Sequence, residues 1–181
     1  MKVSVFIFAA LLVPSAAAAA NVPTPAQTLA LVKASPQLKI DKTVPATETY
    51  DAKTQPYVDV LGTREGQTIG GYLDAKDARQ GTLTSGFVVL AVPLDSGGSG
   101  GVFTQLVFAR RGAAAFFLAG HIDSGGHLDV QIKNGAIVAT MPYYGPKDPN
   151  CCPSKMIVQQ FTIRDNRLQR TSQRTVPTPK P

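Results

Sequence analysis

Two adjacent cysteines are the residues of this chain whose types and spacing offer the clearest chemistry. Cys151 and Cys152 are its only cysteines, and they lie in a run of turn-forming residues that we call the cysteine loop, residues 148–154. The other members of this loop are Asp148, Pro149, Asn150, Pro153 and Ser154. Two thiols can form a disulfide, bind a soft metal ion such as Cu(I), or exchange electrons with another dithiol.

A disulfide between these two neighbours is our leading interpretation. Consecutive Cα atoms are about 3.8 Å apart across a trans peptide, whereas disulfides usually join Cα atoms roughly 4.4 to 6.8 Å apart. Such a bond would be strained and would close almost no loop, so its effect would be to fix one turn between Pro149 and Pro153. Two buried thiols, an intermolecular disulfide and a catalytic redox pair stay open. The redox pair lacks the helix start that lowers a thiol pKa in dithiol enzymes, because Pro153 opens a strand.

The two histidines form a second candidate set. If residues 124–126 make a three-residue turn, His121 faces Asp129 and Asp123 faces His127 on the outer side of a strand pair. Imidazole and carboxylate groups suit zinc or copper, and histidines can make surface charge depend on pH. Cross-strand pairing of opposite charges explains the same pattern without a metal. We therefore assign no metal site and no cofactor.

The clearest structural signal is a tight hairpin. Residues 134–135 are Asn-Gly between two alternating segments, and both residue types tolerate the positive φ of a type I′ turn. The loop then pairs four residues with four others: Lys133 with Ala136, Ile132 with Ile137, Val130 with Ala139, and Leu128 with Met141. The last three pairs put the large apolar side chains on one face, as a half-buried antiparallel hairpin requires.

Strand and turn patterns continue over residues 56–175. Further strands are expected at 57–61, 86–92, 102–109, 113–122, 156–164 and 167–174. The glycine-rich segment 95–101 lacks the Gly-Lys-Ser/Thr ending of a phosphate-binding loop and is interpreted as a connector. The pattern predicts one mainly β (α+β) domain, built as a single curved antiparallel sheet of about six or seven strands with a short N-terminal helix.

The two ends of the chain differ from this domain. Residues 21–55 form a proline-rich leader with one short helix, in which Thr24 is the cap, Pro25 suits the first helical position and Gln27 completes a capping box. Residues 176–181 have no pattern that would make them fold and are expected to be a disordered tail.

Residues 1–20 have the three parts of a secretory signal peptide. Lys2 supplies the positive charge, residues 3–13 are apolar, and small residues lead to a cleavage site between Ala20 and Asn21. The apolar run is too short to span a bilayer comfortably, and no cysteine near the cleavage site could be lipidated. We therefore expect a periplasmic or secreted bacterial protein in an oxidising compartment, without stable membrane insertion.

The net charge and its distribution along the chain limit the class of partner that we expect. The formal net charge is +6, and part of the excess lies near the C-terminus, in Arg164, Arg167, Arg170, Arg174 and Lys180. No aromatic residues interleave with these charges, as single-strand nucleic-acid binders require, so a nucleic-acid partner is not expected. A polar strand face followed by a tail explains the pattern. The partner is then an unknown envelope component, and the sequence does not indicate an oligomeric state.

The cysteine loop also carries a family resemblance. Residues 145–154 read Gly-Pro-Lys-Asp-Pro-Asn-Cys-Cys-Pro-Ser, between a strand-turn-strand pair and an alternating strand with Phe161. This resembles the LppP/LprE lipoprotein group and related exported bacterial proteins with a Gly-Pro-x-Asp-Pro-x-Cys-Cys-Pro-Ser/Thr loop. The resemblance covers residues 103–168 and implies a cell-envelope location, with no catalytic residues to carry over. Unlike the lipoproteins, this chain has no cysteine at its cleavage site.

Three classes of function follow. The first is a non-catalytic envelope protein, a binding or structural module that presents the cysteine loop or an open sheet edge to a partner. The alternative is a thiol-redox or copper(I)-handling protein that uses Cys151 and Cys152. The third is an enzyme, for which the sequence offers no nucleophile–base pair, phosphate loop or metal-ligand set.

Overall fold

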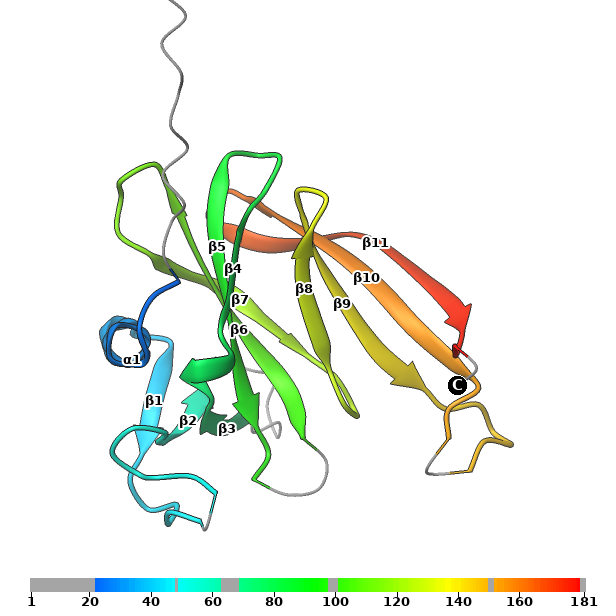
Figure 1. Ribbon diagram of the computed structural model, residues 1–181, viewed down its shortest axis with the longest axis horizontal. Coiled ribbons are helices and arrows are strands. Elements are labelled where there is room, and N and C mark those ends of the chain that lie inside the picture. Colours follow the sequence, from blue (N-terminus) through cyan, green and yellow to red (C-terminus); the bar gives the residue numbers. More distant parts are fainter. Residues whose placement is uncertain (1–21, 48, 63–68, 98–100, 150–151, 180–181) are drawn as a thin grey trace, which may run out of the picture.

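The computed structural model describes residues 22–47, 49–62, 69–97, 101–149 and 152–179, which form two antiparallel sheets and one short α-helix (Figure 1). The first sheet contains β1 (Leu38–Asp41), β2 (Tyr57–Val60), β3 (Ile69–Leu73), β4 (Arg79–Thr82), β5 (Phe87–Asp95), β6 (Val102–Arg111) and β7 (Phe117–Asp123). The second sheet contains β8 (Asp129–Lys133), β9 (Ala136–Tyr143), β10 (Lys155–Arg164) and β11 (Arg167–Pro177). The helix α1 is Pro25–Ala34, and a 3-10 turn, η1, is Ala75–Asp77.

The strands β5 and β6 form the central layer of the molecule. The first sheet, to which they belong, follows the order β1-β2-β3-β5-β6-β7, with β4 paired to β5 beside this path. Six consecutive residues of β5 and six of β6 are buried, and β5 is a nearly continuous apolar run, as is typical of strands that are buried on both faces. The predicted mainly β architecture, with a large antiparallel sheet and a short N-terminal helix, is therefore confirmed. The prediction of a single sheet needs correction, because the last four strands form a second sheet.

Alternation along β5 and β6 divides the core into two clusters. One face sends Val89 and Val107 toward the second sheet, where they pack with apolar residues of β8, β9 and β10. The other face sends Leu90 and Phe108 toward α1 and the strands β1 to β3. Each fully buried leucine or phenylalanine contributes roughly 1.5–3 kcal/mol to folding. The central layer is thus held from both sides.

The helix forms as its sequence predicts. The Thr24 N–H donates to Gln27 Oε1 at 2.8 Å and the Gln27 N–H donates to Thr24 Oγ1 at 3.3 Å, so the capping box is closed. Pro25 is the first helical residue, and buried Val32 fixes the helix on the second apolar cluster. No helix in the described part of the chain is both long and apolar enough to cross a membrane.

The Asn134-Gly135 hairpin is confirmed with its register. Asn134 and Gly135 have φ values of 52° and 70°, as a type I′ turn requires. Ile132 pairs with Ile137, and Val130 pairs with Ala139. Most of the apolar residues of β8 and β9 belong to the first core cluster, so the predicted buried face is the observed one.

Both predicted ends of the domain require correction. β1, which lies inside the predicted leader, pairs with β2 along its whole length, and Leu38 is buried. The leader is therefore part of the β domain. At the other end, β11 continues beyond Arg174: Val176 pairs with Met156, and Pro177 pairs with Lys155. These two residues belong to a strand and not to a disordered tail.

Candidate functional site

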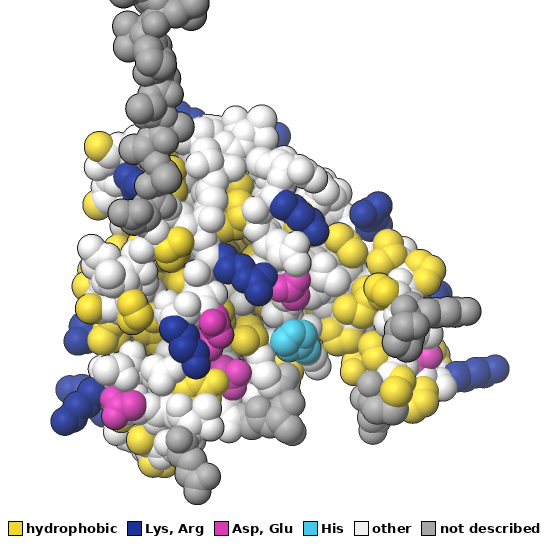
Figure 2. Space-filling model, in the orientation of Figure 1, with side chains coloured by type: hydrophobic (Ala, Val, Ile, Leu, Met, Phe, Trp, Pro, Cys, Tyr) yellow, Lys and Arg dark blue, Asp and Glu magenta, His cyan; other side chains and the backbone are white. Residues whose placement is uncertain are grey.

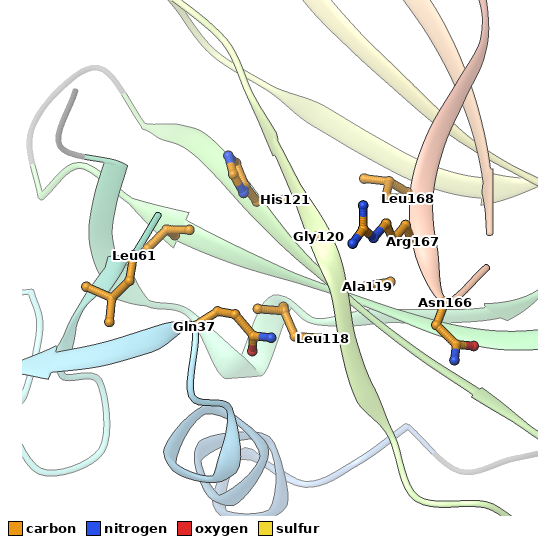
Figure 3. A pocket seen from close by; sticks show the side chains of 10 residues that line it. Gln37, Leu61, Leu118, Ala119, Gly120, His121, Asn166, Arg167 and Leu168 are labelled. Carbon is orange, nitrogen blue, oxygen red and sulfur yellow. The ribbon is translucent and has the colours of Figure 1, made fainter. Parts of the chain in front are cut away.

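The free edge of β7 lies in a groove. β7 is the last strand of the first sheet, and within the described residues it pairs with β6 alone. A cavity of about 390 Å³ and a second of about 220 Å³ follow this strand from Phe116 to His121 and share Gln37 and Leu118. We call these two cavities together the β7 groove. Figure 3 shows β7 passing between the two walls of the larger cavity.

The first wall comes from the β1 and β2 ends. The Leu61 N–H donates to Gln37 O at 2.8 Å, which continues the β1–β2 ladder by one step beyond its last strand pair. This bond holds Gln37 and Leu61 beside β7 (Figure 3). The Leu61 side chain is 47% exposed. An apolar side chain with that exposure can cover the apolar part of a ligand.

The second wall comes from the tight turn between β10 and β11. Asp165 and Asn166 have φ values of 49° and 57°, a conformation that Asp and Asn tolerate better than most residues. The turn places Asn166 and the exposed Arg167 at the groove, and Leu168 follows toward the core (Figure 3). This wall therefore presents the Arg167 cation and the Asn166 amide, with the apolar Leu168 side chain on the side of the core.

Gly120 lets the two sheets meet at the floor of the groove. The β6–β7 register shifts beside it, because Gly120 pairs with Val107 while Leu118 pairs with Phe108. Its φ is 153°, and a Cβ atom there would lie 3.1 Å from Leu168 Cβ. Both the backbone conformation and the close approach favour glycine.

The groove can bind but offers no catalytic pair. His121 Nε2 lies 3.7 Å from Asp123 Oδ1 at one end of the floor. The only hydroxyl side chain among the lining residues is that of Ser35, and it donates to Leu31 O at 2.8 Å, so it is already used to end α1. His121 could act as a base, but a base needs a nucleophile within hydrogen-bond reach, and the lining residues include no other hydroxyl and no thiol.

The cysteine loop is organised around one carboxylate. Asp148 Oδ2 accepts hydrogen bonds from Gly145 N at 2.8 Å, Ser154 N at 2.9 Å and Ser154 Oγ at 2.9 Å. The Ser154 and Gly145 N–H groups favour the ionised form, so the pKa of Asp148 lies below its usual value. Gly145 precedes the loop and Ser154 ends it, so Asp148 closes the base of the loop.

Thr178 braces the same loop from β11. Its N–H donates to Ser154 O at 3.0 Å, and its Oγ1 donates to Pro153 O at 2.7 Å. Within the loop, the Cys152 N–H donates to Pro149 O at 3.0 Å. These bonds fix both sides of the cysteine pair.

Cys152 is exposed and is not a free cysteine. Asn150 and Cys151 lie outside the described residues, so the disulfide between Cys151 and Cys152 stays a prediction. The predicted cleavage site at Ala20 and Asn21 also lies outside the described residues.

The predicted pairing of His121 with Asp129 and of Asp123 with His127 is wrong. β7 and β8 belong to different sheets, and the Leu128 N–H donates to Val102 O where the chain crosses to the second sheet. His121 therefore lies in the β7 groove, whereas His127 and Asp129 line a separate cavity of about 320 Å³. Asp123 stays beside His121 and pairs along the backbone with Thr104. The part of the chain that the structure describes contains no group of three or more His, Cys, Asp or Glu residues suited to a metal ion.

Asp74 is a buried acid that no sequence pattern had indicated. Asp74 is 6% exposed, and its Oδ1 has no hydrogen-bond partner within the described structure. Burial, followed by the charge of Asp77 and a smaller contribution from Asp95, raises the pKa of Asp74 to about 6. Burial and the Asp95 carboxylate likewise raise the pKa of Tyr50 to about 12. No local pattern around residue 74 signals this burial, which depends on how β3 and η1 pack.

No family model, curated protein or solved structure matches this chain. A function must therefore be inferred from the β7 groove and the cysteine loop.

Proposed function

We propose that this protein is an exported, non-catalytic binding module of the bacterial cell envelope and that the β7 groove is its binding site. This proposal rests on the unpaired edge of β7, which is flanked by Leu61 on one side and Arg167 on the other. A concave site with apolar walls and a few polar groups is the usual form of a ligand site. The signal-peptide pattern and the resemblance to the LppP/LprE group support the envelope location.

We propose a structural role for the cysteine loop, with Cys151 and Cys152 joined as a vicinal disulfide. The hydrogen bonds of Asp148 and Thr178 support this role, because they hold the loop on both sides of the cysteines. A Cu(I) site would need two reduced sulfur atoms, and Cys152 is not free. The thiol-redox or copper(I) alternative is therefore the weaker proposal.

The loop and the groove lie at opposite ends of β10. The loop precedes Lys155 and the Asn166 wall follows Arg164, so a ten-residue strand separates them. At about 3.3 Å per residue, this is about 30 Å. The cysteine loop therefore lies outside the groove.

Site-specific photo-cross-linking in the native envelope tests this function. Leu61 is replaced by p-benzoyl-phenylalanine, and Tyr144 is replaced in a matched control, because it is 45% exposed and lies beside the cysteine loop. We expect discrete adducts from position 61 and none from position 144. Adducts from position 144 alone would move the binding site to the cysteine loop, and the absence of adducts at both positions would refute a binding module.

A further inference from the structure

We infer that the ligand of the β7 groove is an extended, acidic peptide segment of another envelope protein, bound as an added strand on β7. The inference rests on the proposed function, since it names the ligand class of the same groove. Strand addition needs an unpaired strand edge, room for an incoming backbone, and side-chain contacts that select the segment. The described residues supply all three.

The edge of β7 differs from the other long edge of the molecule. Proteins usually protect an exposed strand with charges or proline. β11, at the edge of the second sheet, carries Arg170 and Arg174 among exposed polar residues (Figure 1). β7 contains no lysine, arginine or proline, its one carboxylate is its last residue, Asp123, and its pairing is irregular at the bulge beside Gly120. Of the two long edge strands, β7 is therefore the one better suited to pair with an added strand.

The groove has the length of a strand. The two cavities follow β7 from Phe116 to His121, and six extended residues span about 20 Å. A segment in the groove would have a wall on each of its faces, with Leu61 on one and Arg167 on the other (Figure 3). Because side chains of a strand alternate between its faces, successive residues of the segment would meet different walls.

The positive charges near the groove favour a peptide segment with acidic side chains. The exposed Arg167 stands in one wall of the larger cavity. Arg110 lines neither cavity, but its guanidinium lies 5.1 Å from the ring centre of Phe116, which lines the smaller one. Neither cavity is lined by aspartate or glutamate, and neither arginine forms a salt bridge within the described structure. Acidic side chains in the segment would complement both arginines, which favours the encounter and the register of binding.

A second copy of this chain suits the groove less well. Its own β7 edge is recessed between the same two walls, so two copies would bring Leu61 and Arg167 of each into opposition. A lone extended segment has no such walls. Figure 2 shows basic and acidic side chains together on the face that it presents, and the formal net charge of +6 would still make two copies repel each other.

The test uses a displayed library of random twelve-residue peptides as the probe for the purified protein. We expect enriched peptides in which acidic and apolar residues alternate. Their affinity should fall about tenfold with Arg167→Glu and stay within about twofold with Arg174→Glu, an exposed arginine of the same strand that lies outside the groove. Methylation of alternate peptide nitrogens should abolish binding, and bound peptide should protect the amides of residues 117–123 from hydrogen exchange.

Each opposite result overturns the inference. Enriched peptides without acidic residues, affinities that Arg167→Glu leaves unchanged, or binding that survives nitrogen methylation would each do so. A dimer in sedimentation that competes with the peptide would make a second copy the occupant. If position 61 cross-links in the envelope but no peptide is enriched, the peptide ligand is wrong and the binding function stands. If position 144 cross-links and position 61 does not, the binding site moves to the cysteine loop, and if neither position cross-links, the binding function itself fails.

Discussion

The Arg79 side chain joins the two sheets through Asp129. Arg79 Nη1 lies 2.7 Å from Asp129 Oδ1 and also donates to Val130 O at 2.8 Å. Arg79 belongs to β4 of the first sheet, and Asp129 begins β8 of the second. Beyond the ends of these two strands, the Thr84 N–H also donates to Gly135 O at 2.8 Å. These contacts fix the relative position of the sheets and therefore the two sides of the β7 groove.

Removal of this link should weaken the fold modestly. Both side chains are partly exposed, and exposed ion pairs contribute about 0.2–1 kcal/mol. We expect Arg79→Ala to lower the free energy of unfolding by about 1 kcal/mol, because a bond to a backbone carbonyl is lost as well. Urea denaturation measures this change. Arg174→Ala, which removes an exposed arginine without such bonds, should leave the midpoint unchanged, and equal losses in both variants would contradict the assigned role.

Gly120 should be sensitive to the smallest substitution. Gly120→Ala adds a Cβ atom 3.1 Å from Leu168 Cβ at a φ of 153°. We expect a loss of about 1–3 kcal/mol in unfolding free energy, because the crowded side chain must move and the backbone conformation disfavours alanine. The matched control is Gly125→Ala, since a Cβ atom there meets nothing within 4 Å and the residue has no positive φ. Thermal denaturation of the two variants should separate them clearly, and similar melting temperatures would show that the groove floor tolerates expansion.

Asp74 should make stability depend on pH. The folded-state pKa is about 6, raised from an ordinary value of 3.8, so the folded protein binds the proton more tightly than the unfolded chain. Its contribution is fully present below about pH 4 and is lost as the pH rises to 6. We expect Asp74→Asn to raise the free energy of unfolding at pH 7 by roughly 1–3 kcal/mol and to flatten the profile between pH 4 and 6.

Urea denaturation at several pH values provides the measurement for Asp74. Asp77→Asn is the control, since it removes the neighbouring charge and should lower the pKa of Asp74 while leaving the buried carboxyl in place. A profile that Asp74→Asn leaves unchanged would show that this carboxyl is not the titrating group.

The proposed disulfide gives a direct mass prediction. Reduction should increase the monomer mass by the mass of two hydrogen atoms, and alkylation should modify Cys151 and Cys152 only after reduction. We expect the Cys151→Ser, Cys152→Ser double variant to fold and to keep cross-linking from Leu61, because the groove lies at the other end of β10. Immediate alkylation of the untreated protein, or purification with bound copper, would favour the thiol or copper(I) alternative.

The elements whose ends are set by a local turn or cap could be predicted from the sequence. The hairpin at Asn134 and Gly135 was predictable to the register, because positive φ at two adjacent residues leaves one way for the strands to pair. The helix was predictable for a similar reason, since its cap is formed by Thr24 and Gln27 within one turn. β1 carried a readable signal as well: Leu38 and Ile40 alternate with polar residues, but the surrounding prolines favoured an irregular leader.

Long-range pairing was not predictable in the same way. Ser124 and Gly126 have the composition of a hairpin turn, yet the Ser124 N–H donates to Phe103 O, and the chain then leaves β7 for the other sheet. The β7 groove depends on three distant segments, which bring Gln37, Leu61 and Arg167 together. The sequence indicated an open sheet edge as a binding surface but did not indicate which strand provides it.

The brace from Thr178 to Pro153 and Ser154 has a consequence for biogenesis. Under the proposed export, the segment with the cysteines would cross the membrane before Thr178, the residue that clamps it. Until Thr178 followed and β11 docked on β10, the thiols would meet oxidants in an unclamped segment, where pairing with a foreign thiol would compete with pairing between neighbours. On this proposal, the vicinal disulfide would form late, after the C-terminal strand has arrived.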